Sequence, residues 1–155
     1  MDTIWTSVVA VVGTLLGSVI THTFQRLASR RSEAFARSEA LRQERTAVYS
    51  AFAGAAEDYR HGQAERWYCL EEDPDGEAFI RARDEAHRLR TAARQALYRV
   101  KLITDDRDVI LEAERAYHGT RLVSNARTAA ERDTQDTEAK QAIETFVSRA
   151  SLLLR

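Results

Sequence analysis

The sequence predicts an all-α protein in which an N-terminal transmembrane helix continues into a long helix and a cytoplasmic up-down four-helix bundle. Three features carry this prediction: a stretch near the start without charged residues, helix-forming residues at helical spacing over the rest of the chain, and a single proline, Pro74. Proline in a helix interior costs about 3 kcal/mol, whereas Ala, Leu, Glu and Arg favour helix. We therefore expect three segments: 1–25 as the transmembrane helix, 26–44 as a helical neck and 45–155 as the bundle.

The composition limits the classes of function. Charged residues make up 30% of the 155-residue chain and the formal net charge is −1, so the strongly basic surface expected of a nucleic-acid-binding protein is missing. The one cysteine, Cys69, excludes an intrachain disulfide and fits a reducing compartment. We expect no nucleic-acid partner.

The stretch from Ile4 to Phe24 contains no Asp, Glu, Lys or Arg. As a helix rising about 1.5 Å per residue, it reaches about 30 Å, the thickness of a bilayer's hydrocarbon core. No Lys or Arg precedes it and no A-x-A-like site follows, so we expect a membrane anchor rather than a cleaved signal peptide. Basic residues follow it and are expected at the lipid headgroups, which places the carboxy-terminal side in the cytoplasm at the inner or plasma membrane. These residues are Arg26, Arg30, Arg31 and Arg37.

Small and hydroxyl residues form a stripe along the predicted membrane helix. Such residues let membrane helices approach closely and form hydrogen bonds, so the stripe predicts packing between helices and a homo-oligomer or a protein partner. A second interpretation is that the hydroxyl groups line a water-filled pore. The residues are Thr3, Ser7, Ala10, Gly13, Thr14, Gly17 and Thr21.

The helix is expected to continue beyond the membrane to about Leu70. A seven-residue repeat beginning at Leu27 hints at a coiled coil, but arginine and serine occupy the intervening core positions. A better apolar face begins at Val48 and continues through Phe52 and Tyr59, with Trp67 and Tyr68 expected to close one end of the core.

The segment 71–76, with its Pro-Asp-Gly turn signal, is the clearest break in the chain. Its carboxylates do not follow the calcium-loop spacing, so we interpret it as a solvated turn. Residues 77–103 then have apolar side chains spaced alternately three and four apart, which predicts a helix. Its expected core face comprises Phe79, Ala82, Ala86, Leu89, Ala93, Ala96, Val100 and Ile103.

Two more helices are expected. One follows an N-cap at 104–106, with Val109, Ala113 and Tyr117 on its apolar face, and either stops at Gly119 or continues to about Arg132. The last helix should be capped by Asp133 and Thr134 and reach the C-terminus. Its expected apolar face comprises Ile143, Phe146, Val147, Ala150, Leu153 and Leu154.

The patterns that resemble catalytic or metal sites are weak. Residues 84–87 spell DEAH, but no phosphate-binding loop accompanies them, so we assign the match to chance. Asp84 with His87, and Glu114 with His118, are spaced like metal ligands, yet the chain contains no Glu-x-x-His pair of the kind di-iron bundles require. We expect no catalytic residue, no metal and no cofactor. His22, at the inner end of the membrane helix, is interpreted as an interfacial residue, with a pH sensor as the alternative.

Four short pieces of the chain carry a resemblance to a known group of proteins. They are the glycine-containing run 11–17, the pair Arg30 and Arg31, the 49–52 face and the closing run 146–150. With these pieces the chain resembles the uncharacterised single-pass, membrane-anchored helical proteins of high-GC Gram-positive bacteria. The resemblance implies an architecture and a topology and carries no activity.

Our leading hypothesis is a non-enzymatic, membrane-anchored protein whose cytoplasmic bundle serves self-assembly or the binding of a protein partner. The alternative is a homo-oligomeric pore or membrane-disrupting effector with a transmembrane helix lined by small and hydroxyl residues.

Overall fold

A computed structural model describes the backbone of residues 2–154 and the side chains of residues 32, 33 and 35–154. By its internal contacts the chain divides into two units, Met1–Leu41 and Arg42–Arg155. Over the described backbone the secondary structure is helical, with no strand, which confirms the all-α prediction.

Helix α1 spans Asp2–Glu72, 71 residues without a proline. It ends at the predicted break, where Pro74 cannot donate a backbone hydrogen bond. The backbone N–H of Asp73 still donates to the carbonyl of Cys69 (3.1 Å), and the N–H of Gly76 donates to the carbonyl of Asp73 (3.2 Å) to close the turn. The acidic segment therefore terminates one helix and reverses the chain into the next.

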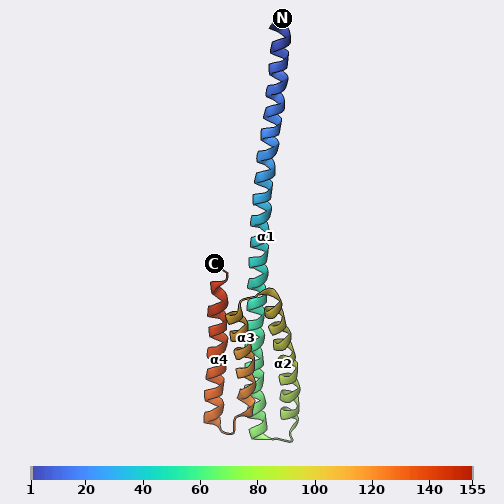
Figure 1. The fold of residues 1–155 in the computed structure, drawn as a ribbon. Coiled ribbons are helices and arrows are strands. Elements are labelled where there is room, and N and C mark those ends of the chain that lie inside the picture. The colour runs from blue at the N-terminus through green and yellow to red at the C-terminus, as the bar shows by residue number, and fades with distance from the viewer. Residues whose placement is uncertain (1, 155) are drawn as a thin grey trace. The chain divides into compact units, whose positions relative to one another are not determined.

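Three further helices complete the unit Arg42–Arg155: α2 (Glu77–Ile103), α3 (Arg107–Leu122) and α4 (Ala129–Leu152), with a short 3-10 helix, η1 (Val123–Asn125), after α3. Within this unit, successive helices run in opposite directions (Figure 1). The unit is thus an up-down four-helix bundle whose first wall is the second half of α1.

The predicted N-cap of α3 is confirmed. The carboxylate of Asp106 accepts hydrogen bonds from the backbone N–H groups of Asp108 and Val109, both at 3.0 Å. These bonds satisfy two of the donors that a helix start leaves without partners.

The predicted start of α4 was wrong. The N-cap is Thr128, whose hydroxyl accepts from the N–H of Glu131 (3.2 Å), while the Glu131 carboxylate accepts from the N–H of Arg127 (2.8 Å). Thr128 and Glu131 match the capping-box spacing, which outcompetes the later Asp133 and Thr134. Those two residues lie inside the helix.

The predicted end of α3 was also wrong in both versions. The helix neither stops at Gly119 nor continues to Arg132, because η1 and an extended residue, Ala126, separate α3 from α4. Val123 and Ala126 in this connection are buried, so apolar burial fixes the path of the chain there.

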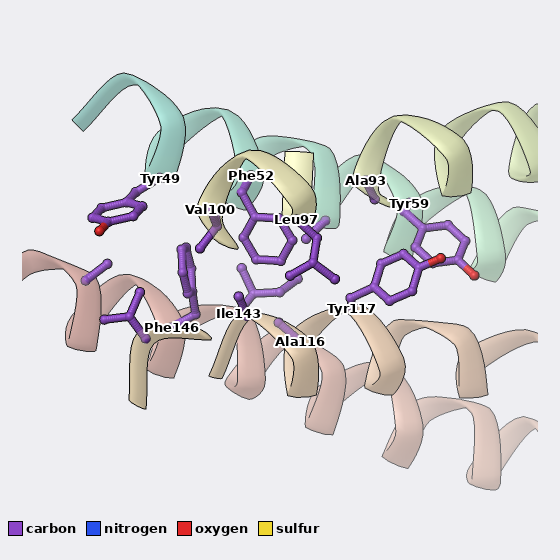
Figure 2. Packing of buried hydrophobic residues seen from close by; sticks show 14 residues of the cluster. Tyr49, Phe52, Tyr59, Ala93, Leu97, Val100, Ala116, Tyr117, Ile143 and Phe146 are labelled. Carbon is purple, nitrogen blue, oxygen red and sulfur yellow. The ribbon is translucent and has the colours of Figure 1, made fainter. Parts of the chain in front are cut away.

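The core of the bundle is centred on aromatic residues from α1, α3 and α4 (Figure 2). Phe52 and Phe146 are fully buried and meet edge to face, with ring centroids 4.8 Å apart. Tyr59 packs on Tyr117 with centroids 5.9 Å apart. Such aromatic pairs are favoured beyond their buried area. On α2 the predicted inward positions Ala86, Ala93 and Val100 are buried, and Leu97, which the prediction omitted, joins them.

Only one of the two aromatic residues expected to close the core does so. Trp67 is buried and its indole N–H donates to the carbonyl of Ala126 at 2.9 Å. Tyr68 is 49% exposed, with the Arg132 guanidinium 4.4 Å from its ring centroid. Neighbouring residues on a helix point in different directions, so both could not enter one core.

Among the residues that the structure describes, no helix is long and apolar enough to cross a membrane. The predicted transmembrane stretch Ile4–Phe24 lies outside the residues whose side chains are described. It stays a prediction.

Candidate functional site

A polar cavity of about 170 Å³ lies where α3 passes into η1, against residues 59–66 of α1 and 86–90 of α2. A cavity that holds one water molecule requires only about 10–15 Å³, so this one accommodates a small ligand or several waters. Nine residues from α1, α2, the end of α3 and η1 line it: Tyr59, Gln63, Arg66, Ala86, His87, Arg90, Arg121, Ser124 and Asn125. We call it the arginine pocket.

Its lining is basic and contains no Asp or Glu. Three arginines reach it from three helices: Arg66 from α1, Arg90 from α2 and Arg121 from the last turn of α3. Among the described side chains, none of the three has a carboxylate within 4.0 Å, whereas Arg60 close by is paired with both Glu57 and Asp136. Unpaired like charges around a concave, polar surface raise the local positive potential and attract anions.

Hydrogen bonding is incomplete at Arg66. Its Nε is shielded from solvent and has no protein acceptor among the described residues. A shielded N–H without an acceptor costs free energy comparable to a lost hydrogen bond.

Tyr59 lines the pocket, and Tyr117 packs behind it. Burial raises the pKa of Tyr59 above its ordinary value of 10.0, against the lowering influence of Arg90. The hydroxyl therefore stays protonated at neutral pH and can donate a hydrogen bond. A side-chain hydrogen bond with Tyr117 raises the pKa of Arg90 above its ordinary value, so this guanidinium is both positioned and charged.

Gln63 connects the elements that line the pocket. Its side-chain amide donates to the Ser124 hydroxyl at 2.8 Å and more weakly to the carbonyl of Arg121 at 3.4 Å. The amide thus links α1 to η1 and fixes where α3 ends. Because Gln63 is only 4% exposed, this link is shielded from competing water.

Glycine allows α1 and α2 to approach closely beside the pocket. A Cβ built on Gly62 would lie 2.5 Å from Cδ1 of Leu89 and 3.8 Å from Cα of Ala86. Any larger residue at 62 forces the Leu89 side chain to move. The close approach of α1 to α2 therefore depends on the absence of a side chain at Gly62.

The residues that the sequence singled out lie mostly elsewhere. Thr3, Ser7, Ala10, Gly13, Thr14, Gly17 and Thr21, together with Arg26, Arg30, Arg31 and His22, lie outside the residues whose side chains are described. Their predicted roles stay predictions. Arg37 is exposed on α1, and its Nε donates to the carbonyl of Glu33 at 3.3 Å.

The spacings that resembled metal ligands do not form a metal site. Among the described side chains there is no group of three or more His, Cys, Asp or Glu that could hold a metal ion. Glu114 pairs with Lys101 across the α2–α3 seam, and the ring of His118 packs against Tyr117. His87, from the DEAH run, lines the arginine pocket.

The arginine pocket was missed by sequence reasoning, although a signal for it exists. The buried face of α1 follows Phe52, Ala56 and Tyr59, and the same face then reaches Gln63 and Arg66. A polar and a charged residue on a face that should be apolar mark a functional or strained position. The partners from α2 and α3 could not be found this way, because arginine also fills their outer faces.

The fold and the pocket define a class first: an all-α, four-helix-bundle protein with an arginine-lined cavity between its helices. Residues 46–154 match the model of the KilB plasmid transfer protein family, and the chain belongs to that family. Comparison with curated proteins and with solved structures gave no significant match.

Proposed function

We propose that the chain acts in plasmid transfer as a membrane-attached, non-enzymatic helical bundle that assembles with further copies of itself or binds a protein partner. The extent of the family match carries the proposal. The match covers 46–154 and the compact unit spans Arg42–Arg155, so the family assignment concerns the whole bundle. Plasmid transfer is the role that the family's description names.

Membrane attachment rests on the stretch Ile4–Phe24. Its uncharged composition and its length of about 30 Å as a helix support a single span. The arginines that follow, from Arg26 to Arg37, support a bundle on the cytoplasmic side.

Self-assembly is supported by exposed apolar side chains as well as by the stripe from Thr3 to Thr21. Leu102 is 86% exposed, and Tyr98, one turn earlier on α2, is 54% exposed. Large apolar groups that share one exposed face favour contact with another surface. The occupant we assign to this face is a second copy of the chain, because the stripe predicts association between identical membrane helices.

Crosslinking of the full chain in native membranes tests the assembly. Wild-type protein should give dimers or larger species, and the double variant Tyr98→Ser with Leu102→Ser should give fewer. Leu122→Ser is the matched control, since Leu122 is 48% exposed on a different helix. A chain that stays monomeric in its own membrane contradicts self-assembly.

Deletion of the gene tests the role. The frequency of plasmid transfer from donor cells should fall, and the full chain supplied in trans should restore it. An unchanged frequency after deletion contradicts the proposal.

Ion flux through liposomes separates this proposal from the pore alternative. Reconstituted full chain should give no flux. A flux that Thr14→Leu abolishes would favour the homo-oligomeric pore, in which the hydroxyl stripe lines the lumen.

A further inference from the structure

We propose that the arginine pocket binds a phosphate group, either free or as the phosphate of a small ester. This binding site goes beyond the proposed role in assembly and does not depend on it. Three properties of the pocket suit a phosphate: the charge of its lining, its hydrogen-bond donors and a volume that admits one such group.

Charge is the first reason. Arg66, Arg90 and Arg121 converge from three helices, with no carboxylate in the lining and no described ion-pair partner within 4.0 Å. Arg60, by contrast, is paired with Asp136. Several guanidiniums without acidic partners in one recess create a positive potential that favours binding of an anion.

The donors are the second reason. The guanidiniums of Arg66, Arg90 and Arg121 supply N–H donors, and the Tyr59 hydroxyl in the same lining is protonated at neutral pH. Guanidinium groups pair with phosphate oxygens through two parallel hydrogen bonds. An anion with several oxygens can engage three guanidiniums and a hydroxyl together, whereas a single carboxylate has only two oxygens to share.

Size and rigidity are the third reason. The cavity volume of about 170 Å³ accommodates one phosphate group with water and does not require the bundle to open. The hydrogen bond from Gln63 to Ser124 joins two elements of its lining. His87 and Arg121 are exposed at its rim, so a ligand can enter from solvent or can remain attached to a larger molecule outside.

Calorimetry on the full chain in mild detergent tests the site with inorganic phosphate as the probe. Arg121→Gln should weaken binding by about tenfold or more, because each lost hydrogen bond to a charged group costs about 1.5–3 kcal/mol and 1.4 kcal/mol corresponds to a factor of ten. Arg90→Gln should do the same, and Arg90→Lys should retain part of the affinity. Arg94→Gln, one turn along α2 and outside the lining, is the matched control.

Two further arms identify the source of the phosphate. One uses a mononucleotide, and the other uses vesicles of phosphatidylcholine with and without phosphatidic acid. The site is supported if any of the three probes binds to wild type and to Arg94→Gln but not to Arg121→Gln. The probe with the highest affinity then identifies the kind of phosphate that the site binds. Arg121 is exposed, so its variant should fold even if Arg90→Gln, which loses the bond to Tyr117, does not.

Three outcomes overturn the proposal. They are the absence of binding to every phosphate probe, an equal loss of binding in Arg94→Gln, and binding of duplex DNA through these arginines without any affinity for inorganic phosphate. None of them bears on assembly or on plasmid transfer frequency, so failure here is distinguishable from failure of the proposed function.

Discussion

Arg60 on α1 and Asp136 on α4 form a partly buried ion pair in which Nη1 of the arginine donates to both carboxylate oxygens, at 2.6 and 2.7 Å. The Nε of Arg60 also donates to Glu57 at 2.9 Å. Burial alone would lower the pKa of Arg60, but the hydrogen bonds to Asp136 and Glu57 outweigh it and the pKa rises above its ordinary value. The pair therefore joins the two helices, with two carboxylates around one guanidinium.

Asp136→Asn should lower the free energy of unfolding by about 2 kcal/mol. Arg60 is only 9% exposed, and the substitution leaves its charge with one acidic partner, Glu57. Urea denaturation of the full chain in mild detergent, followed by near-UV circular dichroism, measures this. Glu85→Gln is the control, since its pair with Arg88 lies on the surface and should contribute little. Equal stability of Asp136→Asn and wild type would show that the pair does not hold α1 to α4.

The aromatic core gives a larger effect. Phe146→Ala removes a fully buried ring that contacts both Phe52 and Tyr49, and should cost about 3–5 kcal/mol. The neighbouring Val147→Ala should change stability by less than about 0.5 kcal/mol, because Val147 is 47% exposed. The same urea denaturation compares the two. A similar cost for both substitutions would place Phe146 outside the core.

The start of α4 is tested by a pair of threonines. Thr128→Ala should cost about 1 kcal/mol, since it removes the acceptor for the N–H of Glu131. Thr134→Ala should be neutral or slightly stabilising, because Thr134 is exposed inside the helix and alanine is the better helix former. A larger loss of stability in Thr134→Ala than in Thr128→Ala would instead support an N-cap at 133–134, as the sequence predicted.

Those threonines also show where sequence reasoning succeeds and where it fails. The helices were predictable because their apolar residues recur at helical spacing, and the turn at 71–76 because proline and glycine break that pattern. The start of α4 was missed because several residues in 128–134 can cap, and the choice depends on the Glu131 carboxylate reaching back to Arg127. The burial of Val123 and Ala126 after α3 depends on contacts that no local pattern encodes.

The arginine pocket was beyond prediction for a related reason. Arg66 lies on the buried face of α1 and could have been noticed, but its companions Arg90 and Arg121 look like the surface arginines around them. Only the packing of α1 against α2 and η1, fixed by Gly62 and Gln63, brings the three together.

Alkaline pH should weaken the bundle through Tyr59. Its pKa is raised in the folded state by burial, so the folded chain keeps the hydroxyl proton at a pH where the unfolded chain loses it. The stability that Tyr59 contributes through this pKa difference is fully present below about pH 10 and is lost as the pH rises through the folded-state pKa. Comparing unfolding free energies at about pH 8 and about pH 11, Tyr59→Phe should show a smaller fall than wild type. An identical fall in both proteins would show that Tyr59 is not the group responsible.

The central claim is that a membrane-attached bundle acts in plasmid transfer, and transfer frequency from cells carrying Val12→Glu tests it most directly. A carboxylate in the middle of the uncharged stretch opposes membrane insertion by about 2.5–3.5 kcal/mol and leaves the bundle sequence unchanged. Thr6→Val, near the end of the same stretch, is the control. At equal protein levels we expect Val12→Glu to abolish both membrane association and transfer, with Thr6→Val behaving like wild type. Wild-type transfer by a Val12→Glu chain found in the soluble fraction would contradict the account.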